Sequence, residues 1–253
     1  MRVLAGTNIT SISTDTFNPL HPVSALLDPH PKRKWKADDG DWQGTVTFSV
    51  NGIDCLVLFG TNARSAKLTI SDPNEVNWEA GVAWESGVEW AFVNIESPRV
   101  LAIQSGSSYA IWIDLAKIES TVNVDMLLIC ASSETLEAGV LRAGIAEDFS
   151  CPSWGMREKL IDYSIRHELS NGSVYYRKRD IVRQFELPID MNRDAEFYRL
   201  VSDIIRENGS VPVAWRLTPL GDDWVVLGRP EMPDAEHDRP HRSRIDCIIT
   251  EVI

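Results

Sequence analysis

The chain has 253 residues, a net charge of -12 and a pI near 4.9, with 43% hydrophobic and 25% charged residues. This is an ordinary globular balance, and the length is sufficient for one large or two ordinary domains. The acidic charge argues against a dedicated nucleic-acid binder, which needs a concentrated basic surface, and against docking on anionic lipid.

The sequence indicates folding in a reducing compartment. No apolar stretch is long enough to span a bilayer, and residues 1–13 lack the apolar core of a secretory signal. Cys55, Cys130, Cys151 and Cys247 lie far apart and form no CxxC pair. We therefore expect four reduced, buried thiols made in a cytoplasm and no zinc site. No cofactor is expected, because no binding motif for one is present.

The first local pattern is the proline-rich stretch "PVSALLDPHPKRKW", which ends on Trp35. We expect Ser24 to cap a short turn with Ala25, Leu26 and Leu27 pointing inward. Asp28 precedes a proline and should end that turn. Trp35 should then open a strand as a core residue.

The basic run Lys32–Lys34 in this stretch has two interpretations. It lies close to the acidic run Asp38–Asp41, so local neutralisation is one, and a small cationic lip that binds phosphate is the other. The acidic run "DDGD" is typical of a solvated turn, with a structural calcium loop as the alternative.

Short segments of alternating or continuous hydrophobicity then predict strands. They are residues 44–50, 54–60, 66–71, 109–115 and 122–133, separated by turn residues. This spacing is typical of an all-β sandwich or jelly roll, and no helix of ordinary length is evident. We assign residues 1–148 to this domain.

Between these strands, the segment 74–99 carries Trp78, Trp84 and Trp90 beside glutamates, six residues apart. On a continuous strand such an interval places the rings on one face, although two glycines interrupt it. Three alternatives stay open, namely core packing, a protein interface and a glycan platform.

Residues 149–253 form the second predicted domain, and the charge pattern differs there: residues 151–253 carry 15 basic and 18 acidic side chains, against 10 and 19 in residues 1–150. One helix is predicted over 194–208, because its apolar residues recur at helical spacing. Leu200 and Ile204 lie at the centre of this stripe as candidate core residues. Asn192 or Asp194 can cap its start, and Gly209 can follow its end.

Strands are expected before and after this helix. They cover residues 181–190, 211–217, 223–228 and 244–253, and the polar loop 229–243 should form an exposed hairpin tip. The second domain is therefore predicted as α+β, a small sheet with one helix packed on it.

The ordered set of motifs resembles a known family. "NPLHPVSALLDPHPKRKWKA", "CLVLFGTNARSAKLTI" and the C-terminal "IITEVI" together look like the galactose-binding-like (discoidin-type) jelly roll and C-terminal part of minor tail proteins of bacteriophages. The likeness covers nearly the whole chain except residues 74–99. His21 also departs from the pattern, since an aromatic residue is common there.

This resemblance implies a structural role without catalysis. No catalytic motif is present, so no enzyme is expected. The implied place is the virion tail, at the tip or baseplate, in tail assembly and host attachment. The partners would be hub, distal tail and tape-measure proteins, with a homo-oligomeric ring of three- or six-fold symmetry and neither nucleic acid nor membrane insertion. The alternatives are a carbohydrate-binding module for a host glycan and a glycan-cleaving enzyme that uses two carboxylates.

Overall fold

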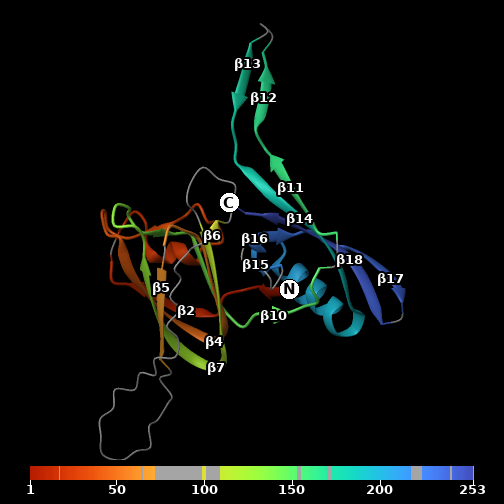
Figure 1. Ribbon diagram of the computed structural model, residues 1–253, viewed down its shortest axis with the longest axis horizontal. Coiled ribbons are helices and arrows are strands. Elements are labelled where there is room, and N and C mark those ends of the chain that lie inside the picture. The colour runs from red at the N-terminus through yellow and green to blue at the C-terminus, as the bar shows by residue number, and fades with distance from the viewer. Residues whose placement is uncertain are drawn as a thin grey trace, which may run out of the picture. The chain divides into compact units, whose positions relative to one another are not determined.

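The computed structural model describes residues 1–16, 18–63, 65–71, 99–100, 109–152, 155–169, 173–217, 224–239 and 241–252. The chain divides into two compact units. We call Gly6–Val100 with Ser108–Ala146 the sandwich unit, and Met1–Ala5 with Leu101–Ser107 and Glu147–Ile253 the sheet–helix unit. Both are mainly antiparallel β, so the predicted fold class is confirmed (Figure 1).

Two long strands, β4 (Gln43–Thr61) and β7 (Tyr109–Ile129), form the centre of the sandwich unit and pair with each other. Their register shifts around Gly52, where the φ angle is +70°, a left-handed conformation that favours glycine. Each long strand joins two of the shorter strands expected from the sequence, because the chain continues through the bulge.

Shorter strands flank the two halves of this pair. Strands β2 (Ile9–Thr14) and β5 (Ser65–Ser71) flank one half, while β9 (Val140–Gly144) and β6 (Arg99–Val100) flank the other. The inward side chains of both halves belong to one hydrophobic cluster, so the halves face each other as the layers of a jelly-roll sandwich. Core residues include Val46, Phe48, Leu56, Leu58, Ile111, Ile113, Val124 and Met126.

The proline-rich stretch closes one end of this core. It forms a short 3₁₀ helix, η1 (Val23–Leu27), in which Leu26 is fully buried, and ends at Asp28 in an extended conformation. The predicted cap by Ser24 is wrong, because Pro22 precedes the helix and no side chain caps it. The fully buried Trp35 opens β3 (Trp35–Lys36), which pairs with β8 (Glu137–Ala138).

The sheet–helix unit contains an eight-stranded antiparallel sheet. Its order is β10 (Glu147–Asp148), β1 (Arg2–Leu4), β15 (Val213–Arg216), β16 (Val225–Pro230), β18 (Arg242–Glu251), β14 (Ile181–Asn192) and β11 (Arg157–Asp162), with β17 (Asp234–Arg239) also paired to β18.

Two expectations are corrected in this unit. The domain boundaries 1–148 and 149–253 differ from the structure, because β1 supplies an inner strand of the second sheet and the later boundary follows Ala146. The loop 229–243 is also shorter than expected, because β17 extends the sheet along β18.

One face of this sheet is covered by the helix, which runs as η2 (Arg193–Phe197) and η3 (Arg199–Arg206) with π-helical winding. Leu200 and Ile204 are fully buried against the sheet. Asn192 accepts a hydrogen bond from the Ala195 amide at 3.3 Å and so caps the start. Gly209 follows the end with a φ of +52°. No helix in the described part of the chain is long and apolar enough to cross a membrane.

Candidate functional site

The most prominent surface feature is a β-hairpin that extends from the sheet–helix unit, which we call the arm (residues 157–169 and 173–180). It continues from β11 into β12 (Ile165–Glu168) and returns through β13 (Val174–Arg177) into β14. Among the described strands, β12 and β13 pair only with each other. Figure 1 shows them reaching beyond the sheet from which β11 and β14 come.

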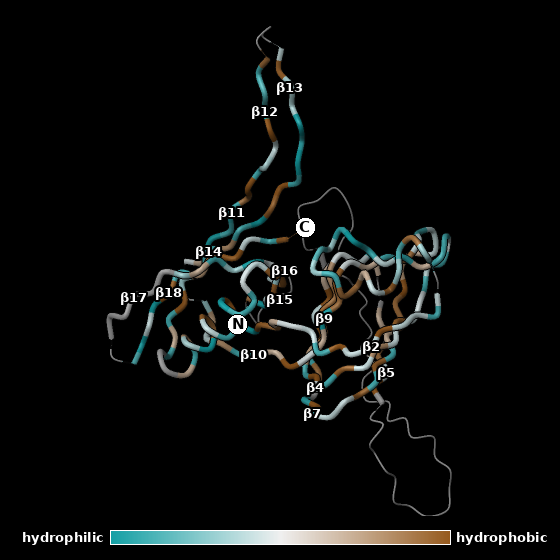
Figure 2. Tube along the Cα trace, turned by 180° about the vertical axis from the view of Figure 1, so that it is seen from behind, coloured by the Kyte–Doolittle hydropathy of each residue, from teal (hydrophilic) through white to brown (hydrophobic). Residues whose placement is uncertain are grey.

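The arm exposes large hydrophobic side chains. Hydrophobic and hydrophilic residues mix along β12 and β13 (Figure 2), and the four residues of β13 are all exposed. A two-stranded ribbon without a buried face is marginally stable in water. Contiguous apolar groups on such a ribbon mark an interaction surface, and tyrosine is enriched in protein interfaces. The exposed residues are Leu160, Tyr163, Leu169, Val174, Tyr175 and Tyr176.

The arm also differs from the remaining chain in charge. Six of the 25 Lys and Arg residues lie in it, but only four of the 37 Asp and Glu residues. The arm is therefore net basic on a strongly acidic protein. This charge is complementary to the remaining surface of the same protein.

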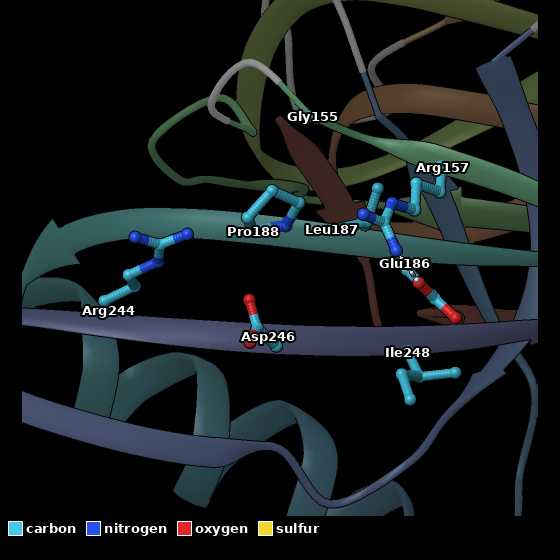
Figure 3. Close-up of a pocket in the computed structure, with 8 residues that line it drawn as sticks. All are labelled: Gly155, Arg157, Glu186, Leu187, Pro188, Arg244, Asp246 and Ile248. Atoms are coloured by element: carbon cyan, nitrogen blue, oxygen red, sulfur yellow. Dashed lines mark ion pairs between the residues drawn. The ribbon is translucent and has the colours of Figure 1, made fainter.

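A trough lies on the sheet face opposite the helix, close to the base of the arm. Its volume is about 460 Å³. Figure 3 shows its lining side chains rising from β11, β14 and β18. The lining residues are Gly155, Arg157, Glu186, Leu187, Pro188, Arg244, Asp246 and Ile248.

The polar groups of this trough are arranged in two sets. Arg157 and Glu186 form a loose ion pair at 4.0 Å. Arg244 and Asp246 lie two residues apart on β18, and in the described structure neither side chain has an ion pair or hydrogen bond. As far as the described side chains show, the trough thus offers Arg244 and Asp246 without an ion pair over an apolar floor of Pro188 and Ile248, although Arg244 lies opposite Asp190 and Glu236 in the strand register.

A smaller cavity, of about 300 Å³, lies where the helix begins. Its central acid, Glu196, accepts hydrogen bonds from the Ser150 amide and the Asn192 amide, both at 2.9 Å. The Ser150 hydroxyl also donates to this carboxylate. These bonds satisfy the Glu196 carboxylate and fix the start of the helix, so the cavity is structural.

The "DDGD" loop exposes a tryptophan on the sandwich unit. Trp42 is 41% exposed and follows Asp38, Asp39 and Asp41, which are exposed as well. The Asp41 amide donates to the Asp38 carbonyl oxygen, as in a turn. Within the described residues, no group of three or more His, Cys, Asp and Glu side chains could hold a metal ion.

The basic run in the proline-rich stretch is part of the architecture. Arg33 pairs with Asp28 at 2.8 Å, and Lys34 pairs with Glu137. The expectation of local neutralisation is confirmed for Arg33, whereas Lys34 pairs with a residue 103 positions away, and for these two cations the expected partners in Asp38–Asp41 are wrong.

The remaining residues singled out in the sequence are three tryptophans and four cysteines. Trp78, Trp84 and Trp90 lie outside the described residues. The four cysteines are free thiols, three of them buried, whereas Cys151 is exposed, which corrects the expectation for that residue.

The arm was missed at the level of the sequence, although a signal for it exists. The dipeptide Asn171-Gly172 lies between two segments rich in β-branched and aromatic residues. Asn-Gly in such a setting is a strong sign of a two-residue hairpin turn.

Comparison with known proteins gives a likeness of fold. No protein family and no curated protein matches the chain. Similar solved structures include the N-terminal domain of the single-strand break repair protein XRCC1, with 12% identity and a TM-score of 0.39, covering 57% of this chain and 100% of that one. A chitosan-binding module from a Paenibacillus sp. IK-5 chitosanase/glucanase has 11% identity and a TM-score of 0.37, covering 55% and 97%.

A third is a CBM32 module of Clostridium perfringens, solved with GlcNAc-α-1,4-galactose, with 14% identity and a TM-score of 0.38, covering 56% of this chain and 94% of that one. We draw no functional conclusion from similarities of this size.

Proposed function

We propose that the protein is a non-enzymatic structural component of a bacteriophage tail, at the tip or baseplate, where it acts in tail assembly and host attachment. The observation that carries the proposal is the arm, whose exposed tyrosines and net basic charge suit a docking element rather than a solvated loop. The choice of assembly rests on the resemblance of the ordered sequence motifs to those of minor tail proteins. Hub, distal tail and tape-measure proteins are the partners in this proposal.

The arm provides a direct test in phage particles. Replacing Tyr175 and Tyr176 together by Ser removes the two aromatic side chains and leaves the strand polar. We expect the purified variant to fold normally, because both residues are exposed, and to be excluded from assembled tails. The matched control is Leu20→Ser, which removes another highly exposed apolar side chain. Normal incorporation of the tyrosine variant would count against the proposal.

The second candidate is glycan recognition by the sandwich unit. The observation in its favour is Trp42, an exposed flat ring that follows three exposed aspartates in the chain, whose carboxylates can accept hydrogen bonds from sugar hydroxyls. Glycan-array binding by the isolated protein, abolished by Trp42→Ala but retained by the tyrosine variant, would support this function. Absence of binding to every glycan would remove it.

A further inference from the structure

The arm and the trough carry complementary charges at the same spacing. On β18, Arg244 and Asp246 lie two residues apart and share one face of the strand. On β12, Arg166 and Glu168 are also two residues apart, and both are exposed. Two residues along a strand span about 6.5–7 Å in either case. A cation and an anion at this separation therefore occur on both surfaces.

The four side chains are available for pairing with another molecule. Within the described residues, no ion pair or hydrogen bond involves the side chain of Arg166, Glu168, Arg244 or Asp246. Their own neighbours on the arm are uncharged, because Arg166 lies opposite Tyr176 and Glu168 lies opposite Val174. An unpaired charge close to an apolar surface gains most from a partner that brings the opposite charge.

We propose that the arm of one copy docks in the trough of a second copy of this chain, with Arg166 against Asp246 and Glu168 against Arg244. The order of the charges requires β12 of one copy to run antiparallel to β18 of the other. On the same face of the arm, Tyr176 and Val174 add apolar contact area for the floor formed by Pro188 and Ile248. This deepens the proposed function and rests on it, since it names the partner of the arm.

The second copy is favoured over other occupants by charge. The net basic arm meets an otherwise strongly acidic protein, and the trough presents charges of both signs, Arg157 and Arg244 with Glu186 and Asp246, rather than a uniform field. A nucleic acid offers only anions, so it would leave Glu168 facing a phosphate. The contact is heterologous, because arm and trough are different surfaces, and it can therefore continue from copy to copy into a ring.

Charge reversal with rescue tests the pairing in the full chain. We expect sedimentation equilibrium of the wild-type protein to show self-association that weakens with salt. Asp246→Arg should weaken it at least about tenfold, and so should Arg166→Asp. The doubly reversed chain, with Arg166→Asp and Asp246→Arg, should recover association. An equimolar mixture of the two single variants should recover association through contacts between unlike copies. Circular dichroism and thermal melting establish that every variant is folded.

The matched control is Asp39→Arg, which makes the same charge change at an exposed site on the sandwich unit. It should leave association unchanged. Failure of the doubly reversed chain to recover, an equal effect of Asp39→Arg, or a strictly monomeric wild-type protein would each overturn the pairing. Binding of a single-stranded oligonucleotide that is lost in Arg166→Asp, without self-association, would overturn it in favour of a nucleic-acid partner.

Incorporation of the tyrosine variant into tails separates this result from the proposed function. If that variant is excluded from tails while the charge reversals have no effect, the tail function stands and the arm binds a different tail protein. If self-association follows the charge pairing but the tyrosine variant enters tails normally, the pairing stands and the tail function is lost.

Discussion

Lys34 donates a hydrogen bond to the carboxylate of Glu137, which lies 103 residues further along the chain. Lys36 approaches the other oxygen of the same carboxylate at 3.2 Å. The contact joins β3 to β8, the two strands that close one end of the sandwich. Asn62 reinforces the same place, because its side chain accepts from the Glu137 amide and donates to the Thr135 carbonyl oxygen, both at 2.9 Å.

Replacing Glu137 by Gln should cost about 1.5–3 kcal/mol at neutral pH, the usual range for hydrogen bonds to charged groups. Burial raises the pKa of Glu137, but the hydrogen bond and charge of Lys34, followed by those of Lys36, outweigh it and hold the pKa below its usual value. A lowered carboxyl pKa stabilises the fold above the ordinary glutamate pKa, and this stabilisation is lost as pH falls through the lowered value.

Urea unfolding at a series of pH values measures this effect. The wild-type protein should lose stability in that acid range more steeply than Glu137→Gln does. Glu119→Gln is the control, because Glu119 pairs with Lys117 on the open surface and its removal should change little. A wild-type protein and a Glu137→Gln variant with parallel acid profiles would refute the assignment.

The basic run Lys32–Lys34 shows which contacts the sequence alone can predict and which it cannot. Residues that lie close in sequence, Lys34 and Asp38–Asp41, are the natural pairing to predict. The actual partner of Lys34 comes from β8, and only the pairing of β3 with β8 brings it there. Strand pairing between distant segments cannot be deduced from local pattern, so the role of the run was predictable and its main partner was not.

A second ion pair is buried in the sheet–helix unit. Removing one of its partners should lower the free energy of unfolding. Arg183 donates to both carboxylate oxygens of Glu251 at 3.3 Å, and the side chains are 10% and 6% exposed. Arg183→Met would leave that carboxylate buried without a counter-charge, at a cost of about 3–5 kcal/mol. The double variant with Glu251→Leu should recover most of this loss, because no buried charge remains.

The loss in Arg183→Met should also depend on pH. Burial raises the pKa of Glu251, and the charge and hydrogen bonds of Arg183 offset only part of this. A raised carboxyl pKa favours the protonated folded state, so its contribution is complete below the ordinary glutamate pKa and is lost as pH rises through the raised value. Without Arg183 the pKa should rise further. Chemical denaturation should therefore show a larger deficit at neutral than at acidic pH, and an equal deficit at both would contradict this.

The helix offers a test of its packing face. Leu200 and Ile204 are fully buried, and changing either to Ala should cost about 2–5 kcal/mol in the free energy of unfolding. Asp203→Ala, on the exposed side of the same turn, should stay within about 0.5 kcal/mol. A small loss for the two apolar residues in denaturant unfolding would mean that the helix does not pack as described.

The helix and the arm differ in how far the sequence could predict them. The helix has a buried stripe, so Leu200 and Ile204 recur at a spacing that identifies it. The arm has no buried face, because β13 exposes Val174 and Tyr176 on one face and Tyr175 and Arg177 on the other. Hydrophobic alternation depends on burial of one side, so a ribbon that is exposed on both sides gives no such pattern. The Asn171-Gly172 dipeptide could have predicted a hairpin, but the exposure of both its faces was visible only in the structure.

Gly139 marks a close backbone crossing that tolerates no side chain. A Cβ atom there would lie 2.8 Å from the Pro31 carbonyl oxygen and 3.1 Å from the Phe59 carbonyl oxygen, both rigid backbone atoms. The Gly139 amide also donates to Phe59 at 2.9 Å, so the segment cannot move away without losing this bond. Gly139→Ala should therefore cost about 1–3 kcal/mol, as overpacking does. Gly6→Ala is the control, because a Cβ atom there meets open space, and it should stay within about 0.5 kcal/mol. Equal unfolding midpoints for the two variants would show that the proline-rich stretch does not pack on β4 and β8 as closely as described.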